Sequence, residues 1–254
     1  MTIWIGIFFG VLQGLTEFLP VSSSGHLVFF NNIFGTNCDF LFFSLLLHLA
    51  TLFAVVVVLW KEIKFLIKKP FSPLAIQLYL STIVTIVMVL IFEAFIKDAF
   101  GGSLLPICFM LTAILLYITE VYTKKQAKPL NLKTSLIMGF AQGIAVLPGI
   151  SRSGATICTG ILCGLSREEA SRFSFLMSIP IIVASMGYDI LDAVVQGEAI
   201  FNVPILPAIF GFISAFLVGV LAVKFMINML QKVKLWWFSI YLIILSIISL
   251  FLIK

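Results

Sequence analysis

The sequence predicts an all-α polytopic membrane protein with an inverted-topology repeat, in which each half has one re-entrant helix pair plus three transmembrane helices. The first observation is the composition. Of the 254 residues, 61% are hydrophobic and only 11% are charged, whereas a soluble domain has about 25% charged residues. The second is a series of apolar runs long enough to cross about 30 Å of hydrocarbon. The third is a motif that occurs once in each half of the chain.

Six apolar runs are expected to be transmembrane helices, because each has close to the roughly 20 residues that a spanning helix needs. They cover residues 40–60, 75–96 and 103–122 in the first half, and 172–190, 204–227 and 235–253 in the second. The expected first repeat is therefore 1–122 and the second is 134–254, with a basic cytoplasmic linker at 123–133 between them.

Two further segments, 1–34 and 134–165, are apolar but interrupted, at Pro20–Gly25 and Pro148–Gly154. The arms of the second segment have about 14 residues each, or roughly 21 Å of helix, which is too short to cross the bilayer. We expect both segments to be re-entrant pairs. Irregular backbone of this kind is tolerated in a membrane only where it lines a cavity in the protein.

The positive charges gather in short loops beside the apolar runs. Lys61, Lys64, Lys68 and Lys69 follow the first span, and Lys124, Lys125, Lys128 and Lys133 follow the third. The positive-inside rule places both loops in the cytoplasm. This distribution explains the net charge of +5, so no nucleic-acid partner is expected. The expected location is the bacterial inner (plasma) membrane, as a multi-pass protein.

The two interrupted segments are related to each other by an internal repeat. Gly10, Gln13, Gly14, Ser22, Ser24 and Gly25 recur 129 residues later as Gly139, Gln142, Gly143, Ser151, Ser153 and Gly154. Each half contains a pair that returns to its starting side and three full spans, so the second half enters from the opposite face. Inverted repeats with interrupted helices usually place their site near the bilayer midplane, where the breaks meet.

The first break combines an acid, hydroxyl groups and an imidazole. Gln13 and Glu17 are four residues apart and share a helical face. Pro20 ends the first helix, and Ser22 can cap the second. The residues that follow are Ser23, Ser24, Gly25 and His26. A helix N-terminus among hydroxyl groups is a favourable phosphate site, because its free N–H groups and its dipole point at the anion.

The second break carries Arg152 where the first has Ser23, between Ser151 and Ser153. The forked donors of arginine match phosphate oxygens. A charge at the bilayer centre costs about 2.5 to 3.5 kcal/mol, so Glu17 and Arg152 indicate function. The alternative is that they form one buried ion pair that holds the halves together. His48, in the first span, is compatible either with a supporting hydrogen bond at the site or with a contact to another helix.

The stretches Gln13-Gly-Leu-Thr-Glu-Phe-Leu-Pro-Val-Ser-Ser-Ser-Gly-His26 and Pro148-Gly-Ile-Ser-Arg-Ser-Gly-Ala-Thr156 resemble the two signature motifs of the undecaprenyl-diphosphatase, or bacitracin-resistance, family. His48-Leu-Ala-Thr51 is similar to the family's His-Leu-Gly-Thr, with Ala50 replacing glycine. The resemblance implies hydrolysis of undecaprenyl diphosphate to undecaprenyl phosphate and inorganic phosphate, which recycles the lipid carrier of cell-wall synthesis and confers bacitracin resistance. It also implies a divalent cation, Mg²⁺ or Ca²⁺, with Glu17 and Gln13 as candidate ligands.

Four residues are therefore predicted to be catalytic: Glu17, Ser23, His26 and Arg152. The predicted substrate-binding residues are Ser22, Ser24, Gly25, Ser151, Ser153 and Gly154. Ser23 is the preferred nucleophile, with His26 as general base or acid; His26 as nucleophile and direct attack by water stay open. The expected partners are the polyprenyl diphosphate lipid and the bilayer, and a homodimer is left open. The alternative function is a membrane transporter or lipid flippase for polyprenyl phosphates, because inverted repeats with re-entrant helices are a transporter architecture.

Overall fold

The chain is helical throughout the part that the structure, a computed structural model, describes: residues 1–35, 40–92, 104–123, 127–196, 203–230 and 232–252. Within these ranges there is no strand. Four helices there are long and apolar enough to cross a membrane, or five if one bent pair is counted as a single span. The prediction of an all-helical, multi-pass membrane protein is confirmed.

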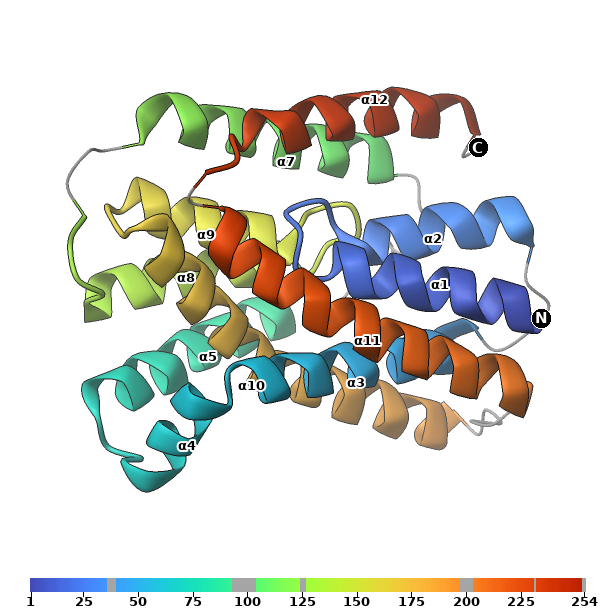
Figure 1. The fold of residues 1–254 in the computed structure, drawn as a ribbon, viewed down its shortest axis with the longest axis horizontal. Helices are drawn as coiled ribbons and strands as arrows, with labels where there is room; N and C mark the ends of the chain where they lie inside the picture. Colours follow the sequence, from blue (N-terminus) through green and yellow to red (C-terminus); the bar gives the residue numbers. More distant parts are fainter. Residues whose placement is uncertain (36–39, 93–103, 124–126, 197–202, 231, 253–254) are drawn as a thin grey trace.

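The described part of the first half begins with two short helices. They are α1 (Ile3–Thr16), α2 (Ser23–Phe34), α3 (Phe40–Val58), α4 (Trp60–Lys68), α5 (Pro73–Ile91) and α7 (Leu105–Tyr122). The second half contains α8 (Leu132–Ile144), α9 (Arg152–Leu162), α10 (Arg167–Gln196), α11 (Ile205–Met229) and α12 (Trp236–Leu252) (Figure 1). The six expected spans overlap α3, α5, α7, α10, α11 and α12. Residues 93–96, the expected end of the second span, and residue 103, the expected start of the third, lie outside the described residues.

The first expected span ends earlier than the apolar run suggests. The chain bends by 78° between Phe42–Val58 and Trp60–Lys68, so that α4 leaves the direction of α3. No residue of α4 is buried, and Lys61, Lys64 and Lys68 are exposed on it. Ile63 and Leu66 nevertheless pack against the main core. A cationic helix with one apolar face is typical of a helix that lies along the membrane surface.

The interrupted segments form two short helix pairs. Their arms have 14 and 12 residues in α1 and α2, and 13 and 11 residues in α8 and α9. At 1.5 Å per residue these arms are about 17 to 21 Å long, which is too short to cross the bilayer. In Figure 1 the two pairs approach from opposite sides, and the loops that join their arms meet near the centre of the molecule. The breaks therefore lie inside the helical bundle.

The repeated glycines are explained by the close packing of the hairpin helices on long neighbours. A Cβ at Gly10 of α1 would overlap the carbonyl oxygen of Gly211 in α11, and one at Gly139 of α8 would overlap the carbonyl oxygen of Ser81 in α5. In membranes, small residues allow helix backbones to approach this closely, and van der Waals packing then holds the helices together. Gly10 and Gly139 thus fix the depth at which each hairpin enters the bundle.

Candidate active site

The first break is a tight turn between α1 and α2. The last turn of α1 closes with the N–H of Glu17 donating to the carbonyl of Gln13 at 3.0 Å, and α2 begins at Ser23 with Ser22 as its N-cap. The hydroxyl of Ser22 accepts a hydrogen bond from the N–H of Gly25 at 3.3 Å. Ser22 has φ = 68°, the sole non-glycine residue with positive φ in the described ranges. Strained backbone of this kind is typical of functional sites, where surrounding contacts over-determine the conformation.

The second break repeats this design. Ser151 is the N-cap of α9, and its hydroxyl accepts a hydrogen bond from the N–H of Gly154 at 3.0 Å. Gly149 has φ = 94°, a conformation that favours glycine. Thr112 of α7 holds the turn from outside, because its hydroxyl accepts from the N–H of Ser151 at 3.1 Å and lies 3.3 Å from the carbonyl of Gly149. The prediction that Ser22 caps the second helix of its pair is confirmed, and Ser151 caps α9 in the same way.

Three polar contacts join the two breaks. The N–H of Gly149 donates to the Ser22 hydroxyl at 3.2 Å, and the Ser153 hydroxyl donates to the carbonyl of Leu19 at 2.8 Å. The third contact is an ion pair between Arg152 Nη2 and Glu17 Oε1. The structure therefore brings the two halves of the predicted site together. Ser22 and Ser153 serve this junction, which was not foreseen for residues predicted to hold substrate.

Glu17 is the centre of the site. Its side chain is buried, and Oε1 pairs with Arg152 while Oε2 accepts from the Ser23 hydroxyl at 2.5 Å and from Gln13 Nε2 at 3.0 Å. His48 Nε2 lies 3.7 Å from the same Oε2. Ser23, Arg152 and His48 are each partly exposed. A hydroxyl, a guanidinium and an imidazole thus surround one buried carboxylate, and these three groups are themselves partly exposed.

His48 faces the site through a single ring nitrogen. Its Nδ1 lies 2.8 Å from the carbonyl oxygen of Ser44, which can only accept, so Nδ1 carries the proton. Nε2 is the ring nitrogen that faces Glu17 Oε2. Of the two alternatives left by the sequence, the contact with the site is the one found.

His26 points away from this group. It is fully buried, with Nδ1 2.6 Å from the carbonyl oxygen of Ser22 and Nε2 2.6 Å from the hydroxyl of Tyr241 in α12. Since the carbonyl can only accept, Nδ1 donates to it and Nε2 accepts from Tyr241. Both nitrogens are therefore occupied by groups other than Ser23 and Glu17. Tyr241 was not predicted, because one aromatic residue in an apolar helix gives no local signal of such a contact.

The remaining predicted substrate-binding residues line the helix starts. Ser24 and Ser22 have their hydroxyl oxygens 3.5 Å apart, and those of Ser151 and Ser153 are 3.2 Å apart. A Cβ at Gly25 would lie 2.9 Å from the Cα of Gly149, so glycine permits the breaks to approach. Of the six residues in this set, Ser24 is the one that is partly exposed; Ser22, Gly25, Ser151, Ser153 and Gly154 are buried.

Few side chains at the site could serve as ligands of a cation. The described residues contain no group of three or more His, Cys, Asp or Glu side chains that could hold a metal ion. Glu17 and Gln13 adjoin each other, and Gln13 Oε1 is buried without a hydrogen-bond partner among the described residues. One carboxylate and one amide oxygen fit a cation that takes its other ligands from phosphate and water, as Mg²⁺ usually does.

Fold and site together define a class of protein: a multi-pass membrane protein with a carboxylate, hydroxyl and guanidinium group enclosed where two interrupted helix pairs meet. Residues 6–248 match the family described as "Bacitracin resistance protein BacA", and the chain belongs to that family. Relatives named "Undecaprenyl-diphosphatase" are similar over nearly their whole length. The protein from Carboxydothermus hydrogenoformans is 42% identical over 241 residues, covering 94% of this chain and 92% of the relative. The one from Treponema denticola is 39% identical over 258 residues, covering 96% and 94%.

Proposed function

We propose that the protein is an undecaprenyl-diphosphatase, which hydrolyses undecaprenyl diphosphate to undecaprenyl phosphate and inorganic phosphate and thereby recycles the cell-wall lipid carrier and confers bacitracin resistance. The observation that carries the proposal is Glu17, which binds Ser23 from its own hairpin and Arg152 from the other. A structural ion pair alone would not need a partly exposed hydroxyl on the same carboxylate. The name shared by relatives at about 40% identity supports the substrate.

Arg152 and the two helix starts are the proposed diphosphate-binding groups. Arg152 is the first residue of α9 and follows the N-cap directly. The first turn of a helix has N–H groups without a partner in the helix. Ser23 and Ser24 occupy the same positions in α2. Helix N-termini and a guanidinium stabilise the charge that develops on a transferred phosphoryl group. Substrate binding would draw Arg152 from Glu17 to the phosphate oxygens.

Ser23 is the proposed nucleophile, with Glu17 accepting its proton. The 2.5 Å contact already directs the hydroxyl at Glu17 Oε2. Attack by Ser23 Oγ on the terminal phosphorus would break the bond to the bridging oxygen, release undecaprenyl phosphate and leave a phosphoserine. Water would then hydrolyse that ester to inorganic phosphate. His48 Nε2, 3.7 Å from Oε2, is positioned to share the proton held by Glu17. His26 as nucleophile and direct attack by water are the competing variants.

A divalent cation, Mg²⁺ or Ca²⁺, is part of the proposal. Glu17 and the unpartnered Gln13 Oε1 would hold it, together with diphosphate oxygens. Such an ion supplies Lewis-acid neutralisation of phosphate charge. Phosphate binding, nucleophilic attack and proton transfer are assigned to side chains of the protein.

We propose that the two halves are inverted repeats. In this relationship α1 corresponds to α8, α3 to α10 and α5 to α11. The packing of α1 on α11 then corresponds to that of α8 on α5, and the packing of α3 on α11 corresponds to that of α10 on α5. These paired contacts support the relationship. The clusters of lysine beside α3 and α7 support an orientation with those loops in the cytoplasm. The bacterial plasma membrane is then the proposed location, and a homodimer is compatible with it.

Phosphate release by purified protein in detergent tests the function. Ser23→Ala, Glu17→Ala and Arg152→Ala should each abolish most of the release from undecaprenyl diphosphate. Ser185→Ala is the matched control, since Ser185 is exposed and its hydroxyl bonds within its own helix at 3.1 Å. Near wild-type rates in all three site variants would refute the proposal. Trapping of a phosphoserine at Ser23 would separate the preferred nucleophile from water and from His26.

A further inference from the structure

The short helix α4 carries three lysines on one face. Lys61, Lys64 and Lys68 follow one another at intervals of three and four residues, so they lie along one side of the helix. All three are exposed. On the opposite side, Ile63 and Leu66 pack against the main core. The three lysines, which we call the lysine face, therefore point away from the rest of the protein.

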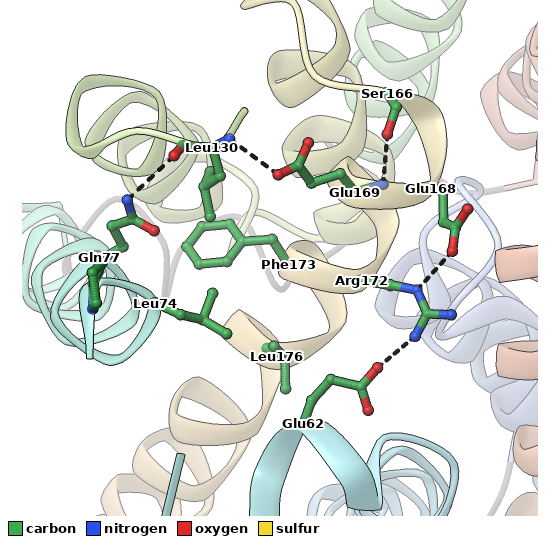
Figure 2. A pocket seen from close by; sticks show the side chains of 11 residues that line it. Glu62, Leu74, Gln77, Leu130, Ser166, Glu168, Glu169, Arg172, Phe173 and Leu176 are labelled. Carbon is green, nitrogen blue, oxygen red and sulfur yellow. Dashed lines mark hydrogen bonds and ion pairs between the residues drawn. The ribbon is translucent and has the colours of Figure 1, made fainter. Parts of the chain in front are cut away.

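In the described part of the chain, no carboxylate pairs with the lysine face. Glu62 is the one acidic residue between positions 60 and 92. It is turned to the other side of α4, where its Oε1 lies 2.5 Å from Arg172 Nη1 of α10 (Figure 2). The three lysines make no hydrogen bond or ion pair with another described residue. Glu62 thus joins α4 to α10, and the lysine face is left to bind an anion from outside the chain.

The position of α4 is that of a helix at the membrane surface. The bend of 78° after Val58 turns α4 across the direction of α3 (Figure 1). Trp60 and Ile67, beside the lysines, and Phe71, just beyond the helix, are all exposed. Tryptophan is enriched at the level of the headgroups. A helix that has lysines on its polar face and large apolar residues beside them lies in the plane of that interface. The groups that surround the lysine face are therefore lipid headgroups.

The charge of the lysine face favours anionic headgroups over neutral ones. Phosphatidylglycerol has a net negative charge, whereas phosphatidylcholine and phosphatidylethanolamine have none. A lysine close to an anionic membrane surface strengthens binding by about fivefold. An acidic soluble protein fits this surface less well, because the exposed Trp60 and Ile67 favour the boundary between headgroups and acyl chains.

We propose that the lysine face of α4 binds anionic phospholipids of the cytoplasmic leaflet. The three ammonium groups donate to headgroup phosphates, and Trp60 and Ile67 enter the boundary with the acyl chains. The ion pair of Glu62 with Arg172 then connects the lipid-bound helix to α10. The choice of leaflet follows from the proposed orientation of the chain. The binding itself is separate from the phosphatase chemistry, because α4 supplies none of the side chains that contact Glu17.

Native mass spectrometry of the purified full chain tests the choice of lipid. The protein is equilibrated with equal amounts of phosphatidylglycerol, phosphatidylethanolamine and phosphatidylcholine that carry the same acyl chains. Phosphatidylglycerol should be retained in preference to both others, and this preference should fall as the ionic strength is raised, because salt screens exposed charges. Equal retention of the three lipids, or a preference for either neutral lipid, overturns the proposal.

Substitution of the lysine face locates the bound lipid. The combined variant Lys61→Gln, Lys64→Gln and Lys68→Gln should lower phosphatidylglycerol retention by about tenfold or more. Its Tm should equal that of the wild type, because the three exposed side chains bond to no described residue. Arginine at the same three positions keeps the charge and should keep the preference. Unchanged retention in the glutamine variant, or loss of the preference in the arginine variant, overturns the assignment.

Three exposed lysines elsewhere provide a control with the same change in net charge. They lie in α8, in α11 and just before α12, and the control variant is Lys133→Gln, Lys224→Gln and Lys234→Gln. This variant should keep most of the phosphatidylglycerol retention, because its lysines are spread over three elements and do not form one face. A loss as large as that in the lysine-face variant overturns the proposal, since retention would then follow the net charge of the protein.

Discussion

Glu17 and Arg152 form an ion pair across 135 residues of sequence, and each comes from the tip of a different interrupted helix pair. Breaking a buried pair by removing one partner usually costs about 3 to 5 kcal/mol, because the other charge is left uncompensated. Loss of activity in a single variant could therefore reflect loss of the fold.

Neutralising both partners should preserve the fold and abolish catalysis. Arg152→Met alone should lower the Tm in detergent, since Glu17 would be left charged and unpaired. The double variant Arg152→Met with Glu17→Gln should recover most of that loss, while phosphate release should stay about 100- to 1,000-fold below wild type. Thermal unfolding and phosphate release on the same preparations check this. A double variant with wild-type activity would leave the pair with a purely structural role.

The two histidines should differ in what they contribute. His48→Gln should reduce kcat by about 100-fold, in the range of an acid–base group, with little effect on the Tm, because its side chain is partly exposed. His26→Ala should lower the Tm as well, because it removes a buried ring that contacts Ser22 and Tyr241. The pair of measurements is kcat and thermal unfolding. Full activity in His48→Gln would exclude it from proton transfer.

Tyr241 should act only through His26. Tyr241→Phe removes the hydroxyl that donates to His26 Nε2 and should reduce activity severalfold. In a His26→Ala background the same substitution should have almost no further effect, because interacting residues are not additive. A double-mutant cycle on phosphate release measures this coupling. Additive losses would mean that Tyr241 contributes by another route.

Gln13 should set the cation requirement. Gln13→Glu adds a second carboxylate beside Glu17 and should lower the Mg²⁺ concentration needed for half-maximal phosphate release. Gln142→Glu is the matched control, because Gln142 occupies the equivalent position in the other hairpin and its buried Oε1 also has no hydrogen-bond partner among the described residues. A shift in the control as large as in Gln13→Glu would contradict Gln13 as a ligand.

The hairpin glycines should tolerate no side chain. Gly10→Ala and Gly139→Ala should each cost about 1 to 3 kcal/mol or more through overpacking and should reduce activity by displacing a break. Gly187→Ala should be nearly neutral, since a Cβ there meets nothing within 4 Å. Tm values for the three variants check the prediction, and equal effects at all three positions would contradict it.

The sequence predicted the elements that depend on local chemistry. Pro20, Pro148 and the serine caps interrupt apolar helices in a way that follows from missing donors and free N–H groups, and the structure has both breaks in the expected places. The proximity of Glu17 and Arg152 was also expected, because the breaks of inverted repeats usually meet near the bilayer midplane. The direct ion pair between them was the alternative to a functional role.

Other features depend on contacts between distant elements and have no local signal. The bend after Val58 occurs in an uninterrupted apolar run without proline or glycine, and α4 diverges where its lysines begin. Tyr241 reaches His26 only because α12 lies beside α7, which follows from the packing of the whole bundle. The orientation of His26 away from Ser23 has the same origin. Ser23 and His26 are three residues apart on α2, a spacing that allows their side chains to meet. The hydrogen bond to Tyr241 instead holds His26 away from Ser23.

The contacts between the breaks also bear on biosynthesis. The ribosome makes the hairpin of Ser23 long before that of Arg152, and Tyr241 follows in the last helix of the chain. Until then, Glu17 lacks its guanidinium partner and His26 lacks its contact with the Tyr241 hydroxyl. The enzyme thus becomes active only when its insertion into the membrane is nearly complete. A truncated translation product would be bound to the membrane but would have no activity.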